Sequence, residues 1–449
     1  MKGYKLSKYV KMVFETPSKE QSEWFGYYNY DTLNSEHSKL LCNRIKEDGI
    51  KPRANLKIEV GYYDILSGEW HYIGSSDSWN WQQGCMAQWL NDEEIIYNSS
   101  ENNHHIAIIH NIKTGTNKKI NWAIYGITPD KKKSIALDME RAHWCRAYHY
   151  ESVIDEKKDG LVYEQDGIFE IDLENNTRKR LISIHDIIDL DNRPYFKKAK
   201  HWIEHVMISP TGKHFCFLHR FSTPNDIYNY KTRLIIVNMN TLEMHCISNW
   251  ELTQWSHFAW DKDNFVIYSY PVHNTPVSAS SFESSIVTVN NNLQCNRAFN
   301  VRHILKKFLK VFYKTFVPIE LDDIFRHNRK HYQYYCLHNN SYVLSKRFKN
   351  ELFDIDGHPS FTPDGKYIIT DTYPDKKNQQ RLIVFNTYNR KYLVLGVFNA
   401  YYKGNPASCD LHPKLSNDGL YVVLDSAHDQ KHHMLMLELN WNDIKKKIS

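Results

Sequence analysis

The sequence predicts an all-β protein: a single seven-bladed β-propeller over residues 1–449, with a helical insertion in one blade. Three observations predict this fold. A tight turn followed by an alternating strand recurs along the chain, further strand pairs lie between the copies, and one long gap has apolar residues at helical spacing. The chain is 41% hydrophobic and 14% aromatic, so it has enough apolar material for a packed core, and disorder is excluded.

The recurring unit is a hydrophobic residue, a turn closed by Asp-Gly, and an alternating strand that ends in Asp. Its clearest copies are 361–371 and 415–425. Asp-Gly suits such a turn because glycine adopts positive φ without steric cost. The copies begin at residues 33, 89, 127, 208, 260, 361 and 415. Further strand pairs such as 234–244 lie between them, so each repeat contains about four strands, which is the blade of a propeller.

The longest gap between copies lies between residues 260 and 361. Within it, the stretch 301–313 has apolar residues at helical spacing. We therefore expect a helical insertion over residues 296–345, on the blade that follows His257.

Charge and composition exclude several classes of protein. The chain has 57 basic and 52 acidic residues, a weak bias that does not call for a nucleic-acid partner. The sequence has no run of 18 apolar residues, which a membrane-spanning helix would need. Its first residues also lack the apolar run that a secretory signal would have. The eight cysteines form no Cys-x-x-Cys pair. A cytoplasmic protein is expected, and the sequence does not indicate its oligomeric state.

Histidines occupy one position of the repeat in four consecutive blades. Three residues before the first hydrophobic residue of each copy, these blades have His205, His257, His358 and His412, whereas the other three have Tyr30, Met86 and Ile124. Equivalent positions on inner strands converge around the channel of a propeller. Four imidazoles gathered there predict a divalent-metal site. The alternative is that these histidines only bond to backbone at the mouth of each blade.

Two of the histidines share an Asp-x-His-Pro spacing. Asp356 precedes His358 and Asp410 precedes His412 by two residues. Because residues two apart in a strand point to the same face, each pair can present a carboxylate and an imidazole together. The aspartate then either binds the metal or orients the histidine from behind.

Further polar residues are expected where second strands of the blades end. Arg220 and Tyr373 lie at such ends, and the segment 138–150 is interpreted as a loop rich in Arg, His and Tyr. The candidate residues of this segment are Arg141, His143, Arg146 and Tyr148. A guanidinium in such a loop can bind a carboxylate or sulfate through two hydrogen bonds at once. A surface loop with stacked side chains explains the composition equally well.

Two amides, Gln82 and Gln83, lie just before the first strand of the second blade. Glutamine at such a place binds sugar hydroxyls or stabilises its own loop, and the sequence does not separate the two. No Gly-rich phosphate loop, His-Glu-x-x-His or Gly-x-Ser-x-Gly pattern is present, so nucleotide binding, zincin chemistry and the α/β-hydrolase nucleophile lose support.

The turns and strands of the repeat resemble those of TolB-like propellers, and the segments 357–365 and 410–419 resemble the blades of oligogalacturonate-lyase-type propellers. The segments 80–84 and 141–150 strengthen the resemblance, which covers most of the chain except the insertion. It implies a cytoplasmic seven-bladed propeller that binds a manganese-like ion through His and Gln. It also implies cleavage of uronate oligosaccharides by β-elimination.

Carried onto this chain, the resemblance implies a role for each candidate residue. The metal ligands are His257, His358, His412, Asp356 and Asp410. His205 is the base, Arg220 and Arg146 hold carboxylates, and Tyr148 belongs with the catalytic residues. Gln82, Gln83, Arg141, His143 and Tyr373 bind the substrate.

The chain departs from the family pattern in one respect. The family's metal cluster has a Gln and two His close together in one blade, whereas Asp356 precedes His358 in this chain. A Mn²⁺-dependent lyase on an anionic, uronic-acid-containing oligosaccharide is expected. The alternative is a non-catalytic propeller that binds a protein or anionic glycan, and a hydrolase or epimerase at the same site is a third reading.

Overall fold

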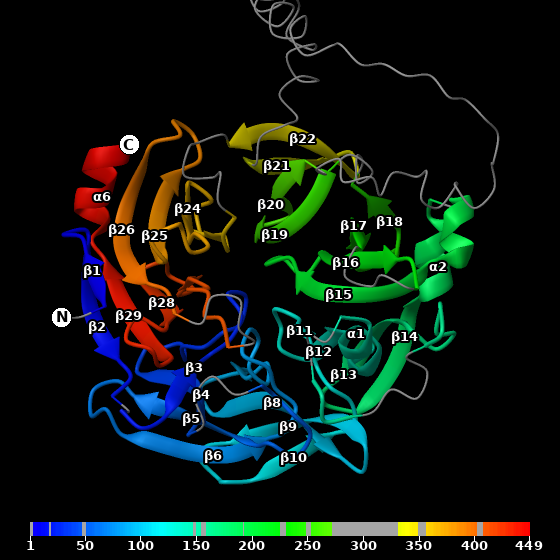
Figure 1. Cartoon of the computed structure of the whole chain (residues 1–449), viewed down its shortest axis with the longest axis horizontal. Helices are drawn as coiled ribbons and strands as arrows, with labels where there is room; N and C mark the ends of the chain where they lie inside the picture. Colours follow the sequence, from blue (N-terminus) through cyan, green and yellow to red (C-terminus); the bar gives the residue numbers. More distant parts are fainter. Residues whose placement is uncertain are drawn as a thin grey trace, which may run out of the picture.

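The chain forms a ring of seven antiparallel sheets around a central axis (Figure 1). The structure is a computed structural model. It describes residues 3–17, 19–46, 51–146, 150–153, 159–191, 193–224, 230–247, 253–271, 331–348, 356–401 and 407–449. The predicted fold class, a seven-bladed β-propeller, is confirmed.

Each predicted copy of the repeat lies at the turn between the first and second strands of one sheet, in the predicted order. The first three sheets, each from its inner strand outward, are β3 (Ser22–Trp24), β4 (Lys39–Ile45), β5 (Ile58–Asp64), β6 (Trp70–Ser76); β7 (Gln88–Trp89), β8 (Glu94–Glu101), β9 (His104–Asn111), β10 (Asn117–Ile120); and β11 (Gly126–Ile127), β12 (Lys133–Ala136), β13 (Gly167–Asp172), β14 (Thr177–Ser183). The next two are β15 (Lys200–Ile208), β16 (His214–Ser222), β17 (Lys231–Asn238), β18 (Met244–Cys246); and β19 (Thr253–Asp261), β20 (Asn264–Pro271), β21 (His331–His338), β22 (Ser341–Phe348).

The last two sheets combine both ends of the chain. They are β23 (Ser360–Phe361), β24 (Tyr367–Thr370), β25 (Gln379–Asn386), β26 (Tyr392–Asn399), β1 (Tyr4–Leu6); and β27 (Lys414–Leu415), β28 (Tyr421–Ser426), β29 (His433–Leu439), β2 (Val10–Glu15). Figure 1 shows the blue strands β1 and β2 beside the orange β26 and the red β29. The N-terminal segment thus closes the ring by adding outer strands to the sixth and seventh blades.

The core lies between neighbouring blades, because each sheet is covered by another on both faces. The strand β16 is buried along its whole length, and Val422, Val423 and Leu424 of β28 are fully buried although they alternate in direction. The sequences of strands that are covered on both faces are continuous apolar runs and do not alternate between apolar and polar residues.

The helices among the described residues are short. Three lie between strands, namely α1 (Met139–Arg146), α2 (Ile184–Asp189) and the 3₁₀ helix η1 (Pro194–Lys198), and α6 (Trp441–Ile448) follows the last strand. The helix α1 corrects the prediction of a loop over 138–150: Asp138 accepts a hydrogen bond from the Arg141 backbone amide at 2.8 Å and so supports its first turn. Within the described ranges, no helix has both the length and the apolar character needed to cross a bilayer.

The expected helical insertion at 296–345 is wrong over its last part. Residues 331–345 belong to β21 and β22, which pair with each other and complete the fifth blade. The first residues of β22 alternate in burial, which is the period of a strand. Residues 296–330 lie outside the described residues.

Candidate metal centre

Irregularities in the inner strands position the four histidines at one end of the channel. The pairing of β15 with β16 shifts register between Glu204 and Met207, and that of β19 with β20 shifts between Trp255 and Phe258. His205 and His257 lie within these bulges. A bulge re-aims a side chain out of the regular ladder.

His358 and His412 come directly before the inner strands β23 and β27. His205 and His412 have positive φ angles of 57° and 45°, a backbone conformation that non-glycine residues rarely adopt. Such local strain concentrates at functional sites.

Three of the histidines form a continuous row of rings. The ring centroids of His257 and His358 are 4.0 Å apart, and those of His358 and His412 are 4.2 Å apart. One ligand atom each from His358, Asp410 and His412 lies within 4.8 Å of the others, a spacing that can hold one metal ion. Three of the five residues expected as ligands thus lie close together, and their binding of a metal stays a prediction.

Hydrogen bonds fix which nitrogen of each imidazole faces the cluster. The Nδ1 of His412 lies 2.6 Å from the Gly26 carbonyl oxygen, and the Nδ1 of His358 lies 2.9 Å from an Asp371 carboxylate oxygen. Because both partners accept hydrogen bonds, each Nδ1 bears the proton and each Nε2 keeps a lone pair. The Nε2 of His412 is buried and has no hydrogen-bond partner among the described residues. A buried lone pair of this kind fits a metal ion.

Asp371 connects the two blades that carry His358 and His412. Its carboxylate accepts hydrogen bonds from the backbone amides of His358 at 2.6 Å and His412 at 3.2 Å, in addition to the His358 ring. Asp425 has the equivalent place one blade further on and accepts from the amides of Phe25 and Gly26. These strand-ending aspartates of the repeat hold neighbouring blades together at the site, a role that the sequence reasoning missed.

Burial and mutual repulsion set the charges of the cluster. Burial lowers the pKa of His358 and of His412 well below the usual range. The charge of a neighbouring histidine disfavours the protonated form of each ring further. Burial and the nearby Asp371 carboxylate raise the pKa of Asp410 to about 8. Neutral imidazoles beside buried carboxyl groups are the donor set that a divalent cation stabilises.

His257 and Asp356 pair with each other beside the three ligands rather than joining them. The Nδ1 of His257 lies 3.2 Å from an Asp356 carboxylate oxygen, and its Nε2 lies 3.5 Å from the hydroxyl of Tyr373. Burial lowers the pKa of His257, but the carboxylates of Asp356 and Asp410 outweigh it and raise that pKa above the usual value. Tyr373 thus adjoins the cluster, as predicted for a substrate-binding residue.

His205 lies across a tyrosine from the cluster. Its ring stacks on Tyr27 at 5.4 Å, and the same tyrosine ring lies 5.1 Å from that of His412. Glu204 next to it is fully buried and binds the Arg220 guanidinium at 2.8 Å. Arg220 therefore already has an internal carboxylate partner, and we leave it out of the residues proposed to hold substrate carboxylates.

The segment of α1 supports the fold more than the site. The buried Arg141 guanidinium donates to the backbone carbonyls of Gly160, Leu161 and His201, at distances from 2.7 to 3.2 Å. We therefore leave Arg141 out of the proposed substrate-binding residues. His143 is buried with its ring against Trp144. Arg146 is the last residue of α1, and Tyr148 lies outside the described residues.

The two glutamines have different surroundings, and sugar binding by either stays a prediction. The fully buried Gln83 donates to the Tyr125 hydroxyl at 2.9 Å, so it stabilises its own surroundings. Gln82 donates to the Ser408 carbonyl at 2.8 Å and also hydrogen-bonds the Asp410 carboxylate, which places it beside the three ligands.

Sequence reasoning missed the segment that crosses the channel between the first blade and the histidines. Tyr28 lies with its ring centroid 5.3 Å from that of His358, and Gly26 supplies the carbonyl that holds His412. Gly26 has a φ of 114°. The only signal for this segment in the sequence is its position just before the first copy of the repeat.

Comparison with known proteins finds no matching family model and no matching curated protein. Solved structures do match. An oligogalacturonate lyase in complex with manganese is 12% identical, with 97% of this chain and 96% of that chain covered and a TM-score of 0.60. The oligogalacturonate lyase of Vibrio parahaemolyticus is 10% identical, with 96% of both chains covered and a TM-score of 0.56. TolB from Acinetobacter baumannii gives a TM-score of only 0.38. The first two show that this chain has the β-propeller fold of oligogalacturonate lyase over nearly its whole length.

Proposed function

We propose that this protein is a divalent-metal-dependent lyase that cleaves uronic-acid-containing oligosaccharides by β-elimination, with Mn²⁺ as its ion. One observation carries the proposal: His358, His412 and Asp410 converge in the channel of this fold, with a buried imidazole nitrogen that has no partner among the described residues. The fold is shared with an oligogalacturonate lyase that binds manganese. Imidazole and carboxylate together suit Mn²⁺.

The reaction needs the carboxylate of the sugar to be neutralised. The C5 proton of a uronate is weakly acidic until the charge on the neighbouring carboxylate is withdrawn, and a bound metal ion supplies that Lewis acidity. His358, His412 and Asp410 would hold the ion, with Gln82 beside them. A base then takes the C5 proton, a double bond forms between C4 and C5, and the C4–O bond breaks, the departing oxygen receiving a proton.

We assign the base to His205 and substrate contact to Tyr373 and Gln82. The position of His205 supports this role. Its ring stacks on Tyr27, and the His412 ring also contacts that tyrosine. Tyr373 supports its role by its hydroxyl, which faces His257 at the edge of the cluster. Arg146 and Tyr148 stay predictions for carboxylate contact and catalysis.

The test is the appearance of the unsaturated product. Purified protein is incubated with Mn²⁺ and oligomers of several uronic acids, and ultraviolet absorbance of the conjugated double bond is followed. We expect product with at least one polyuronate, loss of product after chelation, and loss in His412→Ala but not in His110→Ala, whose ring bonds the Asn117 side chain in the second blade. No product with any polyuronate, together with no bound metal by elemental analysis, would refute the lyase and favour a non-catalytic glycan- or protein-binding propeller.

A further inference from the structure

A second cavity occupies the end of the channel opposite the histidines. It has a volume of about 410 Å³, and residues from the inner strands or turns of all seven blades line it. Tyr28 forms the wall between the two ends: it lines this cavity, while its ring contacts His358 on the other side. Its hydroxyl donates to the Phe258 carbonyl at 2.9 Å, which fixes the wall in place. The volume is that of a small-molecule site.

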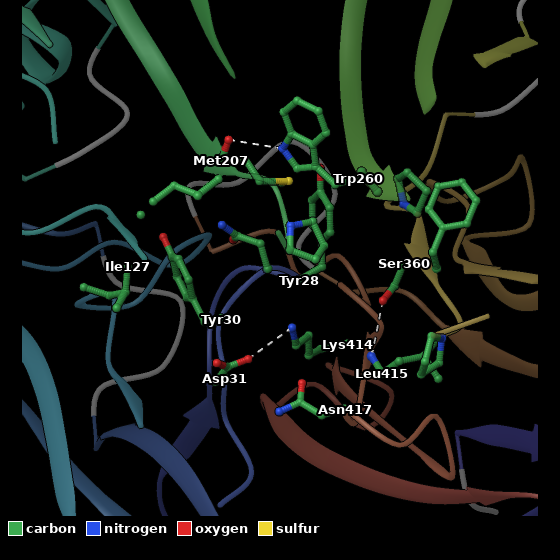
Figure 2. A pocket seen from close by; sticks show the side chains of 18 of the residues that line it. Tyr28, Tyr30, Asp31, Ile127, Met207, Trp260, Ser360, Lys414, Leu415 and Asn417 are labelled. Atoms are coloured by element: carbon green, nitrogen blue, oxygen red, sulfur yellow. Dashed lines mark hydrogen bonds and ion pairs between the residues drawn. The ribbon is translucent and has the colours of Figure 1, made fainter. Parts of the chain in front are cut away.

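The charged groups of the cavity favour an anion. Lys131 and Lys414 both pair with the Asp31 carboxylate, as Figure 2 shows for Lys414, and Lys262 has no ion-pair partner in the described part of the chain. The second carboxylate of the cavity, Asp261, accepts a hydrogen bond from the Tyr334 hydroxyl. Three ammonium groups against two carboxylates leave the cavity with a net positive charge.

The backbone places two of these lysines where glycine is usual. Lys131 has a φ of 61°, at the turn position that is glycine in three other blades, namely Gly212, Gly365 and Gly419. Lys262 has a φ of 56° in the shorter turn of the fifth blade. Glycine adopts this conformation without steric cost, so replacing either lysine by glycine leaves the turn unstrained.

The remaining walls present neutral polar groups and the edges of buried aromatic rings. Ser360, Asn417, Trp260 and Tyr28 all line the cavity (Figure 2), and the two aromatic side chains are only 6% and 3% exposed. The hydroxyl of Ser360 and the amide of Asn417 can bond the hydroxyl groups of a sugar.

We propose that this cavity is a second binding site, independent of the metal centre, for a small sugar that carries an oxyanion, either a carboxylate or a phosphate. Lys262 binds the oxyanion, Lys131 and Lys414 add positive charge beside Asp31, and Ser360 and Asn417 bond the hydroxyl groups of the sugar. Because Tyr28 separates it from the histidines, the site is reached from the opposite mouth of the channel.

The experiment measures binding to the metal-free full chain by calorimetry in the presence of a chelator. Its arms are glucuronate, glucose 6-phosphate, glucose and inorganic phosphate. We expect saturable binding of glucuronate or glucose 6-phosphate, with the tighter of the two identifying the oxyanion, and weaker or no binding of glucose and inorganic phosphate. Because chelated protein and monosaccharides are used, failure of this test leaves the proposed lyase activity untouched.

Two variants test the lysines without endangering the fold. Lys131→Gly combined with Lys262→Gly puts glycine at both positive-φ positions, and we expect it to weaken sugar-anion binding about tenfold or more. Arg390→Gly is the matched control: it removes a cation from a turn with a φ of 65° outside the cavity and leaves binding unchanged. Absence of saturable binding of both sugar anions, equal binding of glucose or phosphate, or unchanged binding in the double variant would each overturn the proposal.

Discussion

At the scale of single residues, Asp371 is the group on which the geometry of the metal centre depends. Its buried carboxylate receives the ring and amide of His358 and the amide of His412, so it orients ligands that come from two different blades. Groups behind metal-binding histidines fix their tautomer and orientation. Asp371 is thus a positioning residue.

Asp371→Asn is expected to weaken Mn²⁺ binding about 10- to 100-fold, because one carboxylate oxygen becomes an amide that opposes the N–H donors. Titration calorimetry with Mn²⁺ measures the affinity, and circular dichroism checks the fold. Asp166→Asn is the comparison, since the buried Asp166 also accepts a hydrogen bond from a backbone amide, that of Gly167, but lies in the third blade and is not among the residues of the candidate centre. Equal loss of affinity in both variants would contradict an orienting role for Asp371.

Gly26 is the second residue that the centre requires. An added Cβ would lie 2.5 Å from the Gln83 backbone carbonyl carbon, and the φ of 114° is unfavourable for any other residue. Gly26→Ala is expected to move the carbonyl that holds His412 and to destabilise the fold by about 1–3 kcal/mol.

Gly115→Ala separates the two effects of the Gly26 substitution, because Gly115 also has a positive φ, of 72°, but an added Cβ there meets nothing within 4 Å. Thermal unfolding and Mn²⁺ titration of both variants are the measurements. Mn²⁺ affinity should fall only in Gly26→Ala. An unchanged affinity in that variant would show that the Gly26 carbonyl does not position His412.

At the scale of elements, the sequence predicts best what local chemistry determines. The turn of the sixth blade is an example: Thr362 bonds Asp364 through its hydroxyl, and Gly365 takes the positive φ that the turn needs. All of this information lies within five residues, so the copies could be recognised one by one. The pairing of β2 with β29 joins residues from opposite ends of the chain, and no local pattern predicts it.

The two wrong predictions at this scale have the same cause. Residues 138–146 were expected to form a loop because Arg and His crowd them, but Arg141 is buried against backbone carbonyls of residues 160, 161 and 201, which turns a polar segment into the internal helix α1. Residues 331–345 were included in the helical insertion, but they complete a sheet whose other strands end before the gap. Both outcomes depend on distant partners.

The closing strand gives a test at this scale. Removing residues 1–7 deletes β1, an outer fifth strand with three paired residues, and is expected to lower the melting temperature only slightly. Removing residues 1–17 also deletes β2, which buries Val10 and Phe14, each contributing about 1.5–3 kcal/mol, and exposes the edge of β29. Thermal unfolding and light scattering should show a large loss of stability and aggregation for the longer deletion alone. Equal behaviour of the two would contradict closure by β2.

At the scale of the whole molecule, the 24 histidines of the chain have more than one role. Register along the repeat identified the row of His257, His358 and His412, because the symmetry of a propeller converts equal positions in the sequence into proximity in space. It could not show that Asp356 pairs with His257, or that Arg220 is bound by Glu204, since these contacts depend on side-chain directions at bulges.

Other histidines are buried far from the candidate centre and act on stability. Burial lowers the pKa of His105 to about 3 and that of His201 to about 4, and it lowers the pKa of His219 well below its ordinary value of 6.5. His201 and His219 stack on each other, and Arg233 donates to His219, so a proton on either ring meets a nearby cation. All three are neutral in the folded protein near neutral pH.

These histidines predict that acid destabilises the fold before its carboxylates titrate. Because their folded pKa values lie below the unfolded value of 6.5, the unfolded chain binds more protons below that pH, and stability falls as the pH decreases toward the folded values. Each contributes a loss of about 1.4 kcal/mol between pH 7.5 and 5.5. Urea unfolding at both pH values measures it, and His105→Gln should reduce the loss by about one such step relative to the unsubstituted protein. If the two proteins lose equal stability on acidification, His105 is not held neutral by the fold.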